Sequence, residues 1–269
     1  MEKVEETPDK TGPRRRIYLL LVIVIVAILL VAIGVIYPYL TPHNKGFTPP
    51  SSIVWGNFTK VSNSYFGSNE TIYFVSWYGC PIGAADSWAF YAYLSSLGNI
   101  TKYVQPHYSN PNDSYPNTPG LIFNGSFSVR GTGFHPYYVY NQSVNATTNG
   151  TPVNISNALS LGLKELQAKL PASIYSIEFS IMENISTTGI STSQSPTPSG
   201  QYFQHINTNV IITGKGGAWV LNGPLFDPSV LSGMNATVLL SNPISVSDIK
   251  SGNETVGAIL RQDSSIVNC

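Results

Sequence analysis

The chain has 269 residues, and its 14 basic and 14 acidic side chains give a formal net charge of zero at pH 7. Charged residues make up only 10% of it, and no basic patch follows residue 16. This argues against nucleic acid as a partner, because proteins that bind it carry a basic surface. With only two cysteines, Cys80 and Cys269, the chain is not a disulfide-rich scaffold.

The first predicted element is a transmembrane helix at residues 17–37, and the lipid bilayer is therefore the first predicted partner. These 21 positions carry no charge, and at about 1.5 Å per residue they span roughly 30 Å, the thickness of a bilayer's hydrocarbon core. No small-residue cleavage site follows, so we expect the segment to be retained. Three arginines at positions 14–16 precede it, which predicts a cytoplasmic tail at residues 1–16 and a domain outside the plasma membrane.

The predicted exterior carries many Asn-x-Ser/Thr motifs, the acceptor pattern for glycans. Glycans would supply the hydration that a surface with so few charges lacks. The candidate asparagines are Asn57, Asn69, Asn99, Asn112, Asn124, Asn141, Asn145, Asn149, Asn154, Asn184, Asn235 and Asn253.

A proline-containing stalk at residues 38–52 is predicted to lead into a first short strand at residues 53–61. The apolar run at residues 71–77 predicts a buried strand, and residues 84–97 predict a helix that ends at Gly98. In this helix Trp88, Tyr91 and Leu94 recur at helical spacing and are expected in the core, whereas Asp86 in its first turn is expected to complement the helix dipole.

Cys80 lies between this strand and this helix. The unpaired N–H groups and the positive end of the dipole at a helix N-terminus stabilise a thiolate over a thiol, which can lower the pKa of a cysteine. Cys80 is therefore the candidate catalytic residue. The opposite interpretation is a small, inert, buried side chain.

Further strands are predicted at residues 100–104 and in a hairpin at residues 118–130, which turns at Asn124-Gly125. Beyond residue 140, Leu159, Leu163, Leu166 and Leu170 predict an amphipathic helix that stops at Pro171.

The period-two alternation of residues 175–181 then predicts a half-exposed strand. A Ser/Thr/Pro-rich linker is expected at residues 186–200, strands at residues 210–213 and 218–221, and a short helix before Cys269.

A strand, a Cys-Pro-x-x turn, a helix, and a Thr-Pro pair 39 residues after the cysteine together resemble the thioredoxin fold. In that family the Thr-Pro bond is cis and its loop packs beside the active cysteine. The resemblance therefore implies that Pro119 is a supporting cis-proline. The implied fold class is α/β, with a thioredoxin-like core at residues 53–140 and a C-terminal α+β extension at residues 141–269 that completes the domain.

The chain is also similar to a family of membrane-anchored thioredoxin-like proteins from archaea and actinobacteria, catalogued as a domain of unknown function. The family pattern Cys-Pro-x-Cys-Ala-Ala-x-x-Trp corresponds to residues 80–88, which match it except at the second cysteine, and Tyr-Pro-Asn-Thr-Pro is met by residues 115–119. An Asn-Gly turn before Pro-x-x-Leu-x-Gly is met by residues 222–233, and such proteins tend to end in a cysteine, here Cys269.

One departure from this pattern concerns the chemistry. Gly83 occupies the position of the second cysteine, so a dithiol cycle cannot run within the turn. Cys269 is the alternative partner for Cys80, because exported cysteines are commonly oxidised. The four histidines have no metal-site spacing, and neither a phosphate loop nor a dinucleotide fingerprint is complete, so no metal and no cofactor are expected.

Two functions remain open. In the first, a membrane-anchored extracytoplasmic protein acts on the thiols or disulfides of exported proteins through Cys80, alone or with Cys269. In the second, a glycosylated envelope protein uses a degenerate thioredoxin fold as a non-catalytic binding or structural platform beside the Thr118-Pro119 loop. An accessible Cys80 favours the first function and a buried Cys80 favours the second.

Overall fold

The computed structural model describes residues 50–154, 156–183, 186–188 and 205–265, together with Tyr18, Val22 and Val26. The chain divides into two units, residues 1–46 and residues 47–269. In the first unit the three described residues are helical and exposed. The rest of the expected span at residues 17–37 lies outside the described residues. Within the described part, no helix is both long enough and apolar enough to cross a bilayer.

The second unit is built on a six-stranded mixed sheet, so the α/β class expected from the sequence is confirmed. Its spatial order is β2-β10-β9-β3-β7-β6. Only β3 and β7 are parallel neighbours, and the other neighbouring pairs are antiparallel. The strands are β2 Phe58–Ser62, β3 Thr71–Ser76, β6 Phe127–Val129, β7 Thr132–Tyr138, β9 Asn209–Gly214 and β10 Gly217–Asn222.

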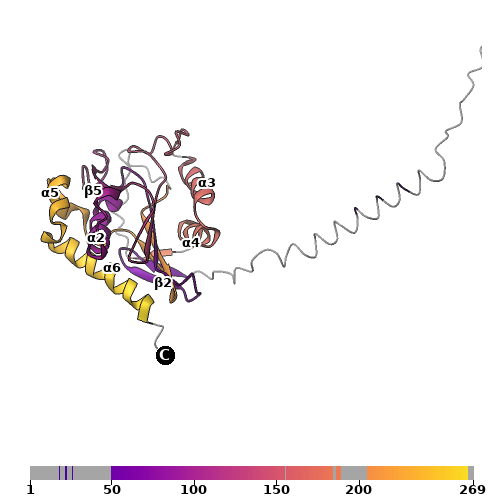
Figure 1. The fold of residues 1–269 in the computed structure, drawn as a ribbon. Coiled ribbons are helices and arrows are strands. Elements are labelled where there is room, and N and C mark those ends of the chain that lie inside the picture. Colours follow the sequence, from indigo (N-terminus) through magenta and orange to yellow (C-terminus); the bar gives the residue numbers. More distant parts are fainter. Residues whose placement is uncertain are drawn as a thin grey trace, which may run out of the picture. The chain divides into compact units, whose positions relative to one another are not determined.

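Helices cover both faces of this sheet (Figure 1). On one face lie α2 Pro81–Leu97, α5 Ala236–Ser241 and α6 Ser247–Ser265, and on the other lie α3 Ala158–Lys169 and α4 Ala172–Glu183. Alternation along β3 sends Phe74 into the core under α2 and Val75 into the core under α3 and α4. The sheet therefore separates two hydrophobic cores.

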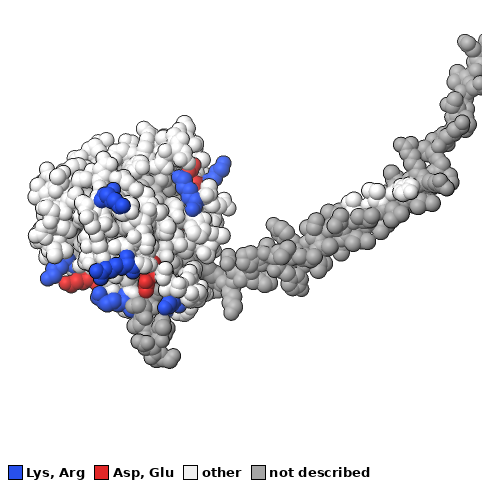
Figure 2. Space-filling view, in the orientation of Figure 1, with Lys and Arg blue, Asp and Glu red and all other residues white. Residues whose placement is uncertain are grey.

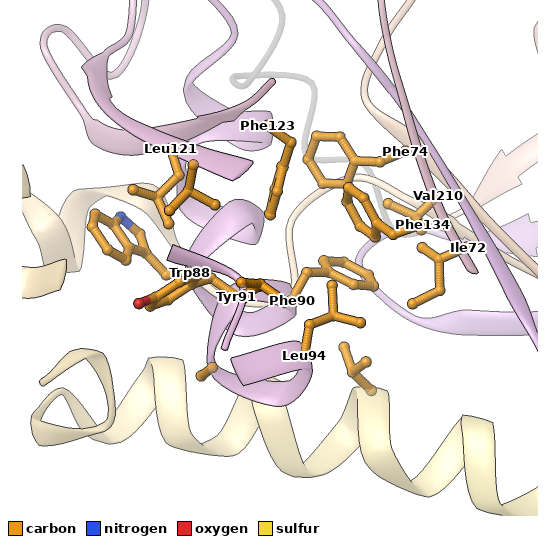
Figure 3. Close-up of a cluster of buried hydrophobic side chains, with 14 of the residues drawn as sticks. Ile72, Phe74, Trp88, Phe90, Tyr91, Leu94, Leu121, Phe123, Phe134 and Val210 are labelled. Atoms are coloured by element: carbon orange, nitrogen blue, oxygen red, sulfur yellow. The ribbon is translucent and has the colours of Figure 1, made fainter. Parts of the chain in front are cut away.

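The core under α2 is mainly aromatic. Figure 3 shows Phe74, Phe123 and Phe134 against Phe90 of α2, and the rings of Phe123 and Phe134 have centroids 4.4 Å apart. Trp88, Tyr91 and Leu94 are buried in it, as their helical spacing predicts. Burial of these large side chains supplies much of the hydrophobic stabilisation of this layer.

Two smaller strand pairs flank the central sheet. In one, β4 Val104–Tyr108 pairs antiparallel with β5 Pro119–Phe123, and in the other β1 Ser52–Val54 pairs parallel with β8 Ser186–Thr188. Single turns of 3-10 helix complete the secondary structure: η1 Thr101–Tyr103, η2 Pro228–Leu231 and η3 Pro243–Ser245.

The strand expected at residues 175–181 is helix α4. Ile174, Ile177 and Ile181 are buried at spacings of three and four, which is the helical period, whereas Phe179 is 39% exposed on the outer side. The apparent alternation arose because a helix face and a strand face share several positions over so short a window.

The prediction of a hairpin at residues 118–130 is also wrong. A turn does form at Asn124-Gly125, where Gly125 adopts a positive φ of 91°. However, β5 pairs with β4 and β6 pairs with β7, so the two strands on either side of the turn do not pair with each other.

Element boundaries differ at four further places. Residues 53–61 form the end of β1 and most of β2 rather than one strand, and the strand expected at residues 100–104 is η1 followed by β4. Helix α2 begins three residues earlier than expected, at Pro81, and the short C-terminal helix is the 19-residue α6. The strands predicted at residues 71–77, 210–213 and 218–221 are confirmed as β3, β9 and β10.

The close approach of β5 to α2 generates a stability prediction. A Cβ atom added at Gly120 would lie 2.5 Å from Cα of Ala84, which is backbone that cannot move aside. We expect Gly120→Ala to lower the free energy of unfolding by about 1–3 kcal/mol. The matched control is Gly133→Ala, whose Cβ would come no closer than 3.4 Å to the side chains of Thr71 and His135, which is ordinary contact. Urea unfolding of both variants checks this, and equal midpoints would contradict it.

Candidate functional site

Cys80 is the N-cap of helix α2. It follows the end of β3, has extended backbone angles of φ −68° and ψ 119°, and Pro81 occupies the first turn of the helix. The N–H of Gly83 donates a hydrogen bond to Cys80 Sγ at 3.5 Å. The expected position at a helix start is therefore confirmed, with the sulfur taking the place of a capping oxygen.

The thiol of Cys80 is buried and free. Only 5% of the residue is exposed, and Sγ is 3.0 Å from Oγ1 of Thr208, which in turn is 2.8 Å from Oγ of Ser76. Burial raises the pKa of Cys80 to about 11, and it outweighs the hydrogen bonds from Thr208 and Gly83, which act to lower it. The lowered pKa expected for a helix-start cysteine is thus wrong, because desolvation of the thiolate exceeds the help from the helix end.

The hydroxyl groups of Ser76 and Thr208 occupy the space that the side chain of a second cysteine would need. A Cβ atom added at Gly83 would collide with Ser76 Oγ and lie 3.0 Å from Oγ1 of Thr208. The hydrogen-bonded pair Ser76 and Thr208 therefore takes the volume that a second thiol would need.

Two loops cover the turn that carries Cys80. The N–H of Asn110 donates to the carbonyl of Gly79 at 2.8 Å, and the N–H of Tyr78 donates to the carbonyl of Tyr140 at 3.2 Å. Gln142 Nε2 joins the two loops by donating to the carbonyl of Tyr108 at 2.9 Å. These contacts close the C-terminal end of β3 over the sulfur.

The Thr118–Pro119 peptide is trans, because the described residues contain no cis bond, so the expected cis-proline is wrong. Its loop nevertheless lies beside α2, since Trp88 Nε1 donates to the carbonyl of Pro119 at 2.8 Å. Pro119 starts β5, which pairs with β4 outside the central sheet. Thr208, and not Pro119, is the residue that both contacts Cys80 and leads into a strand of the central sheet, which is β9.

Cys269 lies outside the described residues. Helix α6 runs beside α2 in the same direction, because Gly252 approaches Ala89 and Gly257 approaches Tyr93. Its end at Ser265 is therefore at the end of α2 opposite Cys80, and α2 is about 25 Å long. The four positions from Ser265 to Cys269 reach at most about 14 Å, so we expect the two cysteines not to pair.

The candidate glycosylation sites divide by exposure. Asn141 and Asn253 are half-buried, and Asn184 lies outside the described residues. Asn235 is exposed, but its Oδ1 accepts from the N–H groups of Thr237 and Val238 as the N-cap of α5. The remaining exposed candidates are Asn57, Asn69, Asn99, Asn112, Asn124, Asn145, Asn149 and Asn154.

Asp86 does not complement the helix dipole as expected. It is fully buried, its Oδ1 accepts from the N–H of Leu225 at 2.8 Å, and its Oδ2 has no partner among the described protein atoms. Burial raises its pKa well above the usual range. Burial therefore favours the protonated form of Asp86, which fastens α2 to the loop after β10.

A second buried acid, Glu178, lies on the other face of the sheet and was missed at the sequence level. Its Oε1 accepts from Asn209 Nδ2 at 2.8 Å, and Asn209 Oδ1 accepts from Asn222 Nδ2. Burial raises the pKa of Glu178 to about 7. The only sequence signal was an acidic residue between isoleucines, and this also fits the exposed side of a strand.

The strands β3 and β7 end at a switch point of the sheet. They are parallel neighbours, yet β3 leads into α2 on one face and β7 leads towards α3 on the other. Ligands of open α/β sheets bind outside the carboxyl ends of strands at such points. Tyr78, which is 36% exposed, stacks there on Tyr138 with ring centroids 5.0 Å apart.

The segments around this switch point carry almost no charge. Residues 131–163 contain no Asp, Glu, Lys or Arg, and residues 103–129 contain only Asp113. Figure 2 shows the charged side chains of one face confined to a few places on an otherwise uncharged surface. In the described part of the chain, His, Cys, Asp and Glu form no group of three or more that could hold a metal ion.

Comparison with protein families matches residues 57–267 to a family described as "Domain of unknown function (DUF929)". No curated protein and no solved structure matches the chain.

Asp86 provides a pH-dependent prediction. Because its folded-state pKa is raised, its contribution to stability is full below its unfolded pKa of about 4 and is lost as pH rises towards the folded value. We expect Asp86→Asn to remove this loss while keeping an acceptor for Leu225 N–H.

Asp86→Ala leaves that N–H unpaired, at a cost of about 1–3 kcal/mol. Urea unfolding at pH 4 and pH 8 is the measurement, with the exposed Asp227→Asn as control. Identical pH dependence in wild type and Asp86→Asn would contradict the assignment.

Proposed function

The chain belongs to the DUF929 family, and from this premise we propose that it is a membrane-anchored, extracytoplasmic, thioredoxin-like protein that serves as a non-catalytic binding platform. The observation that carries the proposal is the burial of Cys80 under hydrogen-bonded loops. A thiol that acts on other proteins must be accessible and at least partly ionised. Cys80 is neither.

The order of four central strands supports the thioredoxin-like assignment. These strands lie in the order β7-β3-β9-β10, in which β7 is parallel to β3, and β9 is antiparallel to both β3 and β10. Helices α2 and α6 cover one face of the sheet, and α3 and α4 cover the other. The thioredoxin fold has this arrangement, with its active cysteine at the helix that corresponds to α2. Thr208, just before β9, lies beside Cys80.

The chemistry of the turn supports a non-catalytic role. A dithiol exchange needs a second thiol to displace the mixed disulfide. At Gly83 the pair Ser76 and Thr208 leaves no room for a side chain. The pKa of Cys80, about 11, leaves the thiol protonated at neutral pH.

The loops over Cys80 support a binding role for this end of the sheet. They are rich in Tyr, Ser and Asn, which supply rigid aromatic area and adaptable hydrogen bonds, as in antibody loops. Tyr78 is backed by Tyr138 and half-exposed, so it can provide a contact without first having to be ordered. The near-absence of charge favours an uncharged partner, such as a neutral segment of an exported protein.

Membrane anchoring rests on the uncharged residues 17–37 and the arginines before them. Eight exposed Asn-x-Ser/Thr sites without a capping role on a charge-poor domain support glycosylation of an exterior surface. Both parts of the proposal place the domain outside the cell.

Thiol chemistry on exported proteins is the competing function. One feature favours it, namely that Cys80 is the N-cap of α2, where a thiolate would be stabilised if water reached it. Measuring how fast Cys80 reacts in the native protein separates the two functions.

For the platform we expect native Cys80 to react with N-ethylmaleimide at least about 100-fold more slowly than in urea, measured by peptide mass spectrometry at pH 5.5. The reason is that modification must await an opening of the structure. Cys269, read out separately in the same digest, serves as an internal reference. Similar rates for native and unfolded Cys80 would favour thiol chemistry.

For the topology we expect a protease added to intact cells to digest residues 38–269 and to spare a small N-terminal fragment. Permeabilised cells are the control, since the cytoplasmic tail is then cleaved as well. Full protection of the chain in intact cells would reverse the proposed orientation.

A further inference from the structure

Glu178 and Cys80 are linked through two consecutive residues of the chain. The side chain of Asn209 binds Glu178 of α4 at 2.8 Å, and the side chain of Thr208 binds Cys80 Sγ at 3.0 Å. Thr208 immediately precedes β9 and Asn209 is its first residue, so one short segment binds both α4 and Cys80, which belong to the same hydrophobic core. A change at Glu178 therefore reaches the thiol through Asn209 and the adjacent Thr208.

The surroundings of Glu178 suit a neutral acid and not a carboxylate. Among the described residues its hydrogen-bond donor is the side chain of Asn209, and its Oε2 is buried with no partner among the described protein atoms. A carboxylate is an acceptor only, so its second oxygen would lie desolvated without a donor, which costs several kcal/mol in order of magnitude.

Among the described residues, the hydrogen bond from Asn209 is the interaction that favours the ionised form of Glu178, and no charged group adds to it. Within the described residues, β9 and β10 contain no titratable side chain, and from these strands only Asn209 and Asn222 join the network. The charged residues of α3 and α4 other than Glu178 are Lys164, Glu165, Lys169 and Glu183, and none of them affects its pKa. Met182 approaches through its sulfur, which contacts Asn209.

We propose that Glu178, Asn209 and Thr208 form a pH-responsive latch that keeps Cys80 covered when Glu178 is protonated and loosens when Glu178 ionises. Ionisation favours states in which Glu178 reaches water, and these separate α4 from the start of β9. Thr208 then no longer holds Cys80 and Ser76, and the thiol becomes accessible. The latch regulates the site of the proposed function and rests on Cys80 being covered in the closed state.

The titration range agrees with this geometry. With a pKa of about 7, Glu178 is mostly protonated at pH 5.5 and mostly ionised at pH 8. The domain is therefore closed in acid and opens above neutral pH. This direction is opposite to that of ordinary acid denaturation, in which carboxylates of broken ion pairs take up protons.

The test is the reaction of Cys80 with 4,4'-dithiodipyridine, a disulfide reagent that remains active in acid, in the full chain with Cys269→Ser. At each pH from 5.5 to 8, the native rate is divided by the rate in urea, which removes the intrinsic pH dependence of the thiol. We expect this ratio to rise about tenfold in the wild-type background. Glu178→Gln, which keeps the acceptor but cannot ionise, should hold the ratio constant. Glu183→Gln on the same helix is the matched control and should behave as wild type.

A flat ratio in the wild-type background, or the same rise in Glu178→Gln, would overturn the latch while leaving the covered thiol intact. A ratio near one at every pH would instead overturn the proposed function. If Glu178→Gln fails to fold, carbon-13 NMR titration of the Glu178 carboxyl group in the wild-type chain decides the matter. A pKa near the usual value of about 4.3 there would overturn the latch.

Discussion

The hydrogen bonds of Thr208 to Cys80 and Ser76 are the contact on which the arrangement of the site depends. They join the start of β9 to the end of β3 and to the first turn of α2, three segments far apart in the chain. Gly83 is required because these hydroxyl groups occupy the space beside it. The thiol is covered because the sulfur is directed at this pair and away from solvent. Removal of the Thr208 hydroxyl would leave two buried polar groups short of a partner.

Two buried acids fasten helices α2 and α4 to neighbouring segments through hydrogen bonds. Asp86 holds α2 to the loop at Leu225, and Glu178 holds α4 to Asn209, one acid on each face of the sheet. Among the described residues no cation affects the pKa of either acid. The ion pair between Lys169 and Glu165 lies at the surface, where such pairs contribute little. Low charge, which the composition already indicates, is therefore also a property of the interior, and the raised pKa values of Asp86 and Glu178 make the contribution of these two acids larger in acid.

Sequence patterns were reliable where one local signal governed the structure. The run at residues 71–77 and the spacing of Trp88, Tyr91 and Leu94 identified β3 and the buried face of α2. The sequence patterns failed where strand pairing depends on residues far apart in the chain. The Asn124-Gly125 turn forms as predicted, but β5 pairs with β4 and β6 pairs with β7. They failed also at α4, because Ile177 and Ile181 fit a strand and a helix equally well until the packing surface is known.

The sequence by itself determined that Cys80 caps a helix, that Gly83 removes the second thiol, and that little charge is available for the surface. These are properties of the local chain and of its composition. Only the tertiary structure decided that the thiol is covered, that Pro119 is trans and lies outside the central sheet, and that Thr208 stands beside the sulfur. The burial and the pKa of Cys80 depend on residues far away in the chain, such as Thr208, which is 128 positions from Cys80. No local sequence pattern records such a contact.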